Sequence, residues 1–354
     1  MKISTVGIDL AKNVVQIHGI NERGKPVVAK ALRRGQVVDY FSNLPPVLIG
    51  MEACASAHYW ARTLQAMGHT VRLMAPQFVK PYVKTNKNDV ADAEAICEAV
   101  TRPTMRFVPI KSIDQQAVLA LHRARQSFVK ARTAQANQVR GMLAEFGHII
   151  PQGIHNLPKR VPEILENASA EMPEAFQALI LRLLDHLRGL DRQAGELEAQ
   201  IIAWHRCNEA SRKLAKIPGI GPITASALVA SIGDPRSFSS GRQLAAWLGL
   251  VPKQHSSGGK QHLMGISKRG DTYLRTLHIH GARAVIFHQG KSEVKSSWLG
   301  RLLARRPWNI AAVAQANKNA RIAWALLARD REYNAGGHVA ALAAAYTESM
   351  LITV

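Results

Sequence analysis

The sequence predicts a mixed α/β domain followed by a mostly helical remainder. Three observations lead to this expectation. In the first 110 residues, short apolar runs typical of strands alternate with turn residues and amphipathic segments. From residue 111 glycine becomes sparse and helix-forming residues dominate. Aromatic residues make up only 6% of the chain, which favours helix interfaces built from Ala and Leu over an all-β core.

The N-terminal region has the pattern of an α/β sheet domain. Strands are expected at 4–11, 14–20, 25–32, 45–52 and 69–76, and the first two form a hairpin. One helix is expected at 59–68, where a glycine ends an amphipathic pattern. A second is expected at 86–100, which begins with polar capping residues.

Residues 111–206 predict a helical arm. Apolar residues recur at alternating spacings of four and three, which is a heptad seam. They are Phe176, Ile180, Leu183, Leu187, Leu190, Ala194, Leu197, Ile201 and Trp204. A second long helix is expected at 115–147, and prolines near 151–158 separate the two. We expect an antiparallel coiled coil that favours oligomerisation. An ordinary helical bundle remains open, because four heptads can pack either way.

The remaining residues predict a third region and a tail. The segment 217–228, "IPGIGPITASAL", opens this region, and a loop-rich stretch follows at 251–271. Helices rich in Ala and Arg come next. The expected domains are therefore 1–110 (α/β), 111–206 (arm), 207–335 (C-terminal domain) and 336–354 (tail).

The charge of the chain indicates a polyanionic partner. There are 46 Lys and Arg against 25 Asp and Glu, a formal net charge of +21, and a pI near 10.3. A folded chain this basic favours nucleic acid as its partner, although a merely soluble basic surface is the alternative. No apolar run is long enough to span a membrane, and Asp9 interrupts the first apolar run, which excludes a signal peptide. The three cysteines lack CxxC spacing and fit the cytosol.

Four carboxylates are candidate metal ligands. Asp9 and Glu52 each lie at the end of an apolar strand, and Asp89 and Asp92 are three residues apart on one helix face. If the four converge at one sheet edge they repel each other, and a divalent cation resolves that repulsion. Oxygen ligands without Cys or His favour Mg²⁺ or Mn²⁺. Each acid alone could equally be a cap or a surface residue, and Asp89 could cap its helix.

Two further motifs suit contact with phosphate. The sequence 217–228 is typical of a helix-hairpin-helix element, in which Gly219 and Gly221 let backbone N–H groups approach a phosphate. A tight turn without a ligand is the alternative. The stretch "PKQHSSGGKQHLMGISKRGD" at 252–271 places Ser256 and Ser257 beside two glycines. A flexible loop is the alternative there. It also supplies basic residues that suit phosphate, namely Lys253, Lys260, Lys268 and Arg269.

These motifs together resemble one known family. The sequence contains, in this order, "GIDLAK", "GMEA", "KNDVADAEAI", "IPGIGPITA", "LAAWLGLVPKQHSSGGKQHLMGISKRGD" and "ANKNARIAWALL". Their combination resembles the DEDD transposases of insertion-sequence family 110, and within it the 1111 subgroup. The resemblance extends from about residue 3 to residue 330.

The resemblance implies a fold, a mechanism and partners. It implies an RNase H-like domain similar to Holliday-junction resolvases of the RuvC type, with Asp9, Glu52, Asp89 and Asp92 binding Mg²⁺. It implies a nucleophilic serine that forms a phosphoserine link to DNA. That serine falls at Ser257, and the doubled serine leaves Ser256 open. The implied protein is a bacterial, cytoplasmic recombinase, a dimer or tetramer, which a structured non-coding RNA guides to donor and target DNA.

The guide RNA and the DNA that the resemblance implies are candidate partners of the basic helix at 115–147. Arg123, Arg125, Lys130 and Arg132 on the helix at 115–147 are expected to contact nucleic acid. Two other functions remain as alternatives. One is a metal-dependent junction endonuclease that hydrolyses DNA with a purely structural serine. The other is a non-enzymatic basic scaffold, which would have no need of four placed acids.

Overall fold

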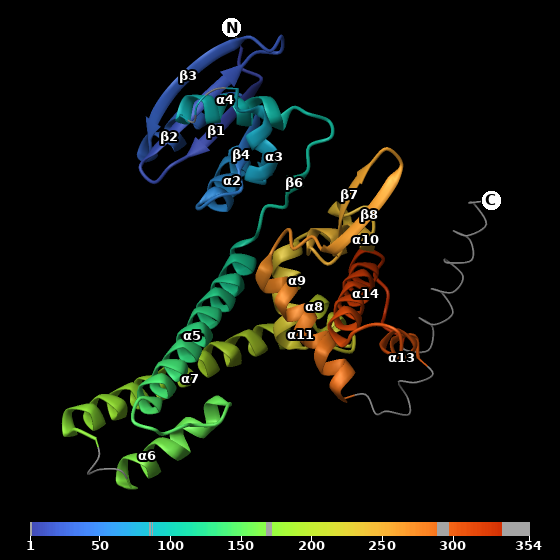
Figure 1. Cartoon of the computed structure of the whole chain (residues 1–354). Coiled ribbons are helices and arrows are strands. Elements are labelled where there is room, and N and C mark those ends of the chain that lie inside the picture. The colour runs from blue at the N-terminus through green and yellow to red at the C-terminus, as the bar shows by residue number, and fades with distance from the viewer. Residues whose placement is uncertain (1, 85, 87, 168–171, 289–296, 335–354) are drawn as a thin grey trace. The chain divides into compact units, whose positions relative to one another are not determined.

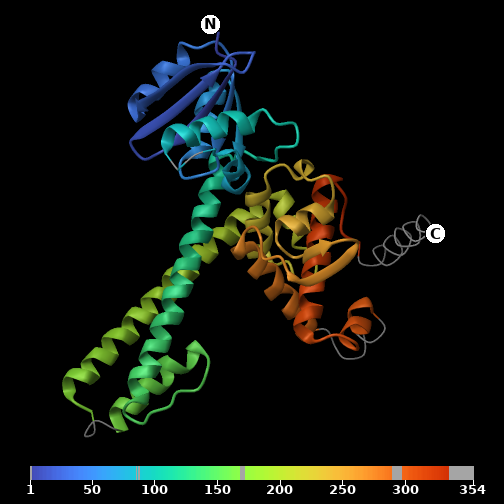
Figure 2. The ribbon, with the colours of Figure 1, turned by 45° about the horizontal axis from the view of Figure 1, so that its top comes forward.

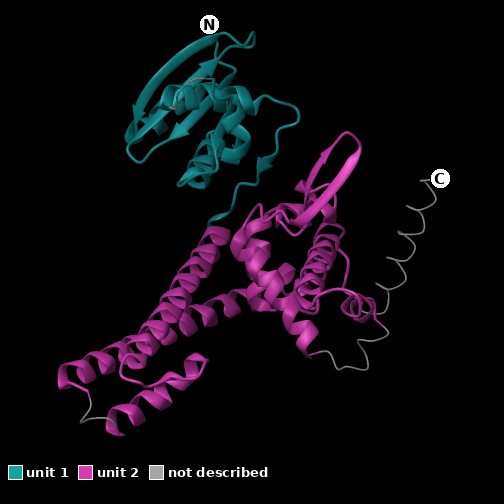
Figure 3. Ribbon diagram, in the orientation of Figure 1, with its two compact units in different colours: residues 1–113 teal, residues 114–354 magenta. Residues whose placement is uncertain are grey.

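The computed structural model describes residues 2–84, 86, 88–167, 172–288 and 297–334. The chain divides into two compact units, Met1–Ile113 and Asp114–Val354 (Figure 3). The expected tail at 336–354 lies outside the described residues. Among the residues that are described, no helix is long and apolar enough to cross a membrane.

The first unit is built on one mixed six-stranded sheet (Figure 1). In spatial order β3-β2-β1-β4-β5-β6, the first three strands pair antiparallel, β1, β4 and β5 run parallel, and β6 is an antiparallel edge. The strands are β1 Thr5–Leu10, β2 Val14–Ile20, β3 Pro26–Arg33, β4 Leu48–Glu52, β5 Thr70–Met74 and β6 Phe107–Val108. The expected α/β class, its five strands and the first hairpin are confirmed.

Two helices cover opposite faces of this sheet, and strand alternation explains the division. Val6 and Ile8 point to the face where α2 (Ala57–Ala66) contributes the buried Trp60 and Leu64. The intervening Gly7 points to the other face, against α4 (Asp89–Val100). Both helices were expected from sequence. Two short ones were not: α1 Val37–Ser42 and α3 Pro76–Val79.

Helix α4 lies in unusually close contact with the sheet. A Cβ added at Gly7 would lie 2.2 Å from the carbonyl oxygen of Ala93, and one at Gly50 would lie 2.7 Å from the Cβ of Val100. Two neighbouring strands therefore carry glycine where the helix crosses them, because no side chain fits there. The Sγ of Cys97 also donates to the carbonyl oxygen of Thr5 at 3.8 Å. Cys97 thus lies over the start of β1, and the N-terminal part of α4 lies over the end of that strand.

The second unit begins with two long antiparallel helices, α5 (Ile113–Ala144) and α7 (Glu174–Cys207), which lie side by side in both views (Figures 1 and 2). Ion pairs join them: Arg125 to Glu198 at 2.5 Å, and Arg132 to Asp191. Increasing numbers on one helix meet decreasing numbers on the other, as an antiparallel pair requires. The two expected long helices are thereby confirmed. Their coiled-coil geometry stays a prediction.

A third helix, α6 (Leu157–Asn167), packs on this pair and was not expected. Its Leu157, Val161 and Leu165 join a buried cluster with Val139 and Leu143 of α5. Pro158 and Pro162 hid it from the sequence pattern. Pro158 lies in the first turn, where an N–H has no intrahelical acceptor, and Pro162 is accommodated inside the helix.

The C-terminal part is a compact group of helices around one apolar cluster. Gly219 lies in the turn between α8 and α9, at φ +86°, against Gly281 of α11. A Cβ on Gly281 would lie 1.8 Å from the carbonyl oxygen of Gly219, so this contact requires glycine. The helices are α8 Glu209–Leu214, α9 Pro222–Ile232, α10 Gly241–Trp247, α11 Thr272–His288, α13 Trp298–Leu303 and α14 Trp308–Ala328.

The expected loop at 251–271 is wrong over most of its length. Residues Pro252–Ser257 (β7) and Lys260–Ile266 (β8) form an antiparallel hairpin. Its two-residue turn is Gly258-Gly259, with φ values of +56° and +77°. Two consecutive positive φ angles define the hairpin turn that matches strand twist, and Gly-Gly supplies them. The strands were missed because both are exposed along nearly their whole length and β7 carries no apolar alternation.

A buried histidine ties the arm to the C-terminal helices. His122 of α5 is 1% exposed, and its ring nitrogens lie 3.0 Å from the hydroxyl oxygen of Tyr273 and 3.1 Å from that of Ser226. Burial, assisted by Arg125, lowers the pKa of His122 from 6.5 to about 4. The folded chain therefore keeps this ring neutral, whereas the unfolded chain protonates it below about pH 6.5.

This difference predicts an acid-dependent loss of stability. The contribution of neutral His122 is fully present above pH 6.5 and is lost as the pH falls from there towards 4, because only the unfolded state gains the proton. Between pH 6 and 5 the His122→Gln variant should lose about 1 kcal/mol less unfolding free energy than the wild type. Urea denaturation at both pH values measures this. The control His280→Gln replaces an exposed histidine of α11 and should follow the wild type. Equal losses in His122→Gln and wild type would contradict the burial argument.

Candidate active site

The strand acids Asp9 and Glu52 are neighbours at one sheet edge. Strands β1 and β4 run parallel, and Ile8 of β1 lies opposite Met51 of β4. Asp9 and Glu52 each follow one of these two residues, so they lie next to each other at the ends of the strands. Strand alternation places Asp9 on the same face as Gly7, and Glu52 on the same face as Gly50. That face carries α4. Both side chains are half-buried.

The helix acids lie at the same edge. Asp89 and Asp92 occupy the first turn of α4, and the next residue after Asp92 is Ala93, whose carbonyl lies over Gly7. The helix therefore brings its N-terminal turn to the end of β1 that carries Asp9. The expectation that all four acids gather at one edge is supported by this packing. Asp89 does not cap the helix, because the Asn88 side chain accepts from the Ala91 N–H at 2.8 Å.

The thiol of Cys54 lies in the electrostatic field of both strand acids, Asp9 and Glu52. The pKa of the Cys54 thiol is raised by partial burial first, and then by the negative charges of Glu52 and Asp9. Cys54 follows Glu52 in the turn before α2, and its N–H donates to the Glu52 carbonyl at 2.9 Å. Both carboxylates thus act on the same thiol, which agrees with their neighbouring places in the strand register.

The donor set suits a hard divalent cation. All four side chains are carboxylates, the ligands that Mg²⁺ and Mn²⁺ prefer. Within the described part of the chain, no three Asp, Glu, His or Cys side chains yet lie close enough to hold a metal ion. The backbone therefore gathers the acids at one edge, whereas their side chains do not form a closed set of ligands.

The hairpin separates the two candidate serines onto opposite faces. Ser257 pairs with Lys260 across the hairpin. The next pair whose side chains lie on the same face is His255 with His262. Ser256 lies on the other face, where its hydroxyl accepts from the Gln254 amide at 2.9 Å. Both serines are exposed. Ser257 thus shares its face with a lysine and two histidines, the groups that suit an anionic substrate.

The basic residues near the hairpin occupy two places. Lys253 and Lys260 are exposed on the strands themselves. Lys268 and Arg269 lie in the turn before α11, where Lys268 has a positive φ of 53°. The Arg269 carbonyl accepts from the Arg275 guanidinium at 3.0 Å, which holds this turn against the helix.

The other predicted contact residues have structural tasks as well. Gly219 packs against Gly281, whereas Gly221 has open space around its Cβ position and precedes the N-terminus of α9. Arg125 and Arg132 form the ion pairs between α5 and α7. Arg123 and Lys130 are exposed. A role of any of these residues in nucleic-acid binding stays a prediction.

The fold and the gathered acids fit a DEDD nuclease-type domain, and comparison with known proteins identifies the class. The profile DEDD_Tnp_IS110, described as "Transposase", matches residues 6–148, and the profile of the "Transposase IS116/IS110/IS902 family" matches residues 211–297. The chain is therefore a transposase, and its DEDD domain implies use of a divalent metal.

Relatives over nearly the whole length narrow this to one family. A Pseudomonas aeruginosa protein described as "Probable family 20 transposase" is 54% identical over 95% of this chain and 100% of its own length. The IS1111A transposase of Coxiella burnetii is 44% identical, over 94% and 92% respectively. The IS1328 transposase of Yersinia enterocolitica is 43% identical, over 91% and 96%. The chain belongs to the IS110 family of insertion-sequence transposases.

Sequence reasoning did not identify the residues that position the acids. Gly7 and Gly50 allow α4 to approach the sheet, and Asn88 caps the helix instead of Asp89. A usable signal was present: glycine at matching positions of two apolar strands marks a place where another backbone approaches closely.

The response of Cys54 to the two strand acids is testable. Asp9→Asn removes a negative charge that raises the pKa of the thiol, so this pKa should fall and alkylation at fixed neutral pH should accelerate. The rate is measured in a Cys207→Ser background, because Cys207 is exposed and Cys97 is buried.

The control is Glu22→Gln, which removes a carboxylate from the turn that follows β2 and lies at the opposite edge of the sheet. It should leave the alkylation rate of Cys54 unchanged. If Asp9→Asn and Glu22→Gln behave alike, Asp9 does not face Cys54 and the assignment of this edge is wrong.

Proposed function

We propose that this transposase is an RNA-guided DNA recombinase that joins itself to DNA through Ser257. The acids Asp9, Glu52, Asp89 and Asp92 form one half of its chemistry, and the serine hairpin forms the other. The observation that carries the proposal is that one chain of this family presents both: four carboxylates brought to one sheet edge, and an exposed serine beside basic groups at a hairpin turn.

The acids would hold Mg²⁺ or Mn²⁺. A divalent ion bound there would neutralise the phosphodiester and stabilise the attacking and leaving oxygens. The chain's own contribution is the placement of the ligands: Asp9 and Glu52 are fixed by the sheet, and Asp89 and Asp92 by the helix that the glycines admit. The strand order, with three antiparallel strands followed by two parallel ones, favours an RNase H-like domain.

Ser257 is the better nucleophile of the two serines. Its oxygen would attack phosphorus, forming a phosphoserine while one P–O bond to a sugar oxygen breaks, and the hydroxyl proton leaves to a base. Rejoining reverses these bonds without an external energy source. The Ser256 hydroxyl is engaged with Gln254, and it lies on the face away from Lys260, His255 and His262.

The charge and the arm fit a nucleic-acid partner of considerable size. A net charge of +21 suits simultaneous binding of guide RNA with donor and target DNA. RNA pairing would supply sequence specificity, which leaves the protein mostly backbone contacts. The helical arm, with exposed Arg123 and Lys130, would contact RNA or a second subunit, and the N–H groups behind Gly221 would approach phosphate as in a helix-hairpin-helix.

The alternative is a metal-dependent endonuclease that hydrolyses DNA at the acids while the hairpin only binds. The exposed position of both serines permits this reading, because in the part of the chain that the structure describes no basic side chain is hydrogen-bonded to the Ser257 hydroxyl. The two functions differ in whether DNA ever becomes covalently attached to protein.

A covalent adduct decides between them. Wild-type protein, guide RNA and a labelled DNA substrate are incubated with Mg²⁺, denatured and separated by gel electrophoresis. Ser256→Ala should keep the protein–DNA adduct within a few-fold of wild type, whereas Ser257→Ala should abolish both adduct and strand exchange, because it removes the attacking oxygen.

The control for the acids is Asp92→Asn, which should lose adduct formation while Ser257 is intact. Two results would contradict the proposal. Strand exchange by Ser257→Ala would show that the serine is not the nucleophile, and DNA products without any adduct in the wild type would favour the hydrolytic alternative.

A further inference from the structure

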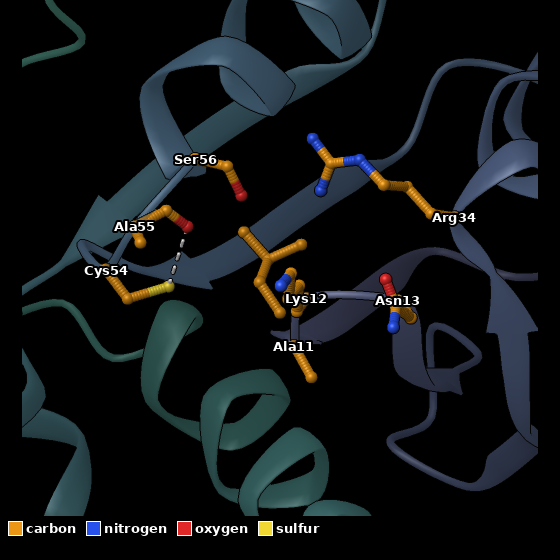
Figure 4. A pocket seen from close by; sticks show the side chains of 8 residues that line it. Ala11, Lys12, Asn13, Arg34, Cys54, Ala55 and Ser56 are labelled. Carbon is orange, nitrogen blue, oxygen red and sulfur yellow. Dashed lines mark hydrogen bonds between the residues drawn. The ribbon is translucent and has the colours of Figure 1, made fainter.

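A pocket of about 690 Å³ opens beside the strand acids in the first unit. It is lined by the β1–β2 loop, Leu10 to Asn13, by Arg34, and by the turn Cys54 to Ser56 that leads into α2 (Figure 4). Both backbone segments continue directly from catalytic candidates, since Leu10 follows Asp9 and Cys54 lies two residues after Glu52. The pocket lining therefore begins within two residues of each strand acid.

Two cations give the pocket its charge. Lys12 and Arg34 both line it, and neither forms an ion pair with an acid in the part of the chain that the structure describes. Fixed backbone contacts hold their segments together: the Arg34 N–H donates to the Asn13 carbonyl at 2.9 Å, and the Ala11 N–H to the Val14 carbonyl at 3.1 Å. The two positive charges therefore come from a single hydrogen-bonded junction of β1, β2 and β3.

The arginine is held in place as well. Its guanidinium carbon lies 5.1 Å from the ring centre of Trp60, a residue of α2 that is 3% exposed. Across the pocket, the Ser56 side chain points towards Arg34 (Figure 4). Ser56 has a φ of 66°, a conformation that costs a non-glycine residue about 1 to 3 kcal/mol and is concentrated at ligand-binding positions.

We propose that this pocket binds the phosphodiester next to the one that is cut. Lys12 and Arg34 bind its oxygens and the Ser56 hydroxyl donates to it, so the strand is held as it enters the acid edge. A planar guanidinium and an ammonium without acidic partners match a phosphate. The statement that the bound phosphodiester is next to the one that is cut rests on the proposed function. The binding of a phosphodiester in this pocket does not.

Cys54 makes occupancy of the pocket measurable without any chemistry on DNA. In full-length Cys207→Ser protein it is the exposed thiol, and it lines the pocket. An oligodeoxythymidylate present at about ten times its Kd should slow Cys54 alkylation roughly tenfold, because bound strand covers the thiol. The measured quantity is the ratio of rates with and without the oligonucleotide in the same protein, which cancels any change in intrinsic thiol reactivity.

Matched variants test the role of the two cations. Lys12→Ala changes an exposed side chain in a loop, and Arg34→Ala removes the guanidinium; each should reduce the protection of Cys54 severalfold. Arg33→Ala, the exposed neighbour on β3, should keep full protection. Total binding, followed by fluorescence anisotropy, should change little in all three, because most of the basic surface remains.

Two further experiments identify the strand that occupies the pocket and test the pocket independently of the proposed function. Oligouridylate of equal length tests RNA: protection by either strand supports the subsite, and the stronger one identifies its occupant. Ser257→Ala protein should show full protection even if the serine mechanism fails. Absence of protection by both oligonucleotides, or protection that survives Lys12→Ala and Arg34→Ala together, would overturn the assignment.

Discussion

The close contact between helix α4 and the sheet is the constraint on which the rest of the candidate site depends. Gly7 and Gly50 stand side by side on β1 and β4, and each lacks the Cβ that the helix backbone or Val100 would exclude. Because Asp9 and Glu52 are two residues further along the same strands, the acids face the same helix. The N-terminal turn of that helix then supplies Asp89 and Asp92. A larger residue at Gly7 would move the helix and separate the acids.

The second unit presents its two candidate serines on an exposed hairpin. A two-stranded ribbon gains little from apolar burial, so its shape depends on the Gly258-Gly259 turn and on its attachment at both ends. The turn fixes which side chains share a face, and so it separates Ser257 from Ser256. The contact of Gly219 with Gly281 joins the α8–α9 turn to α11, and the His122 contacts join α9 and α11 to the arm.

Much of the first unit could be predicted from sequence because its strands are apolar and its helices amphipathic. Val6 and Ile8 on one face, with glycine between them, carry a readable signal. The serine hairpin could not be predicted in this way, since Gln254, His255 and the serines carry no apolar alternation; only the Gly-Gly pair signalled the turn. The four acids could be proposed from their positions in the sequence, whereas Lys12, Arg34 and Ser56 come together only through tertiary contacts. Arg125 and Arg132 have a structural task that the charge pattern alone did not reveal, because both form ion pairs with acids of α7.

The central claim is that the four acids form one divalent-metal site, and binding of Mn²⁺ to the full-length protein tests it most directly. Electron paramagnetic resonance counts free Mn²⁺ during titration and requires neither DNA nor RNA. We predict saturable binding to the wild type that is weakened at least tenfold in Asp9→Asn and in Asp92→Asn, one acid from the sheet and one from the helix. Glu94→Gln, which changes an exposed acid one turn further along α4, should bind like the wild type. Wild-type affinity in either aspartate variant would contradict a site shared between sheet and helix.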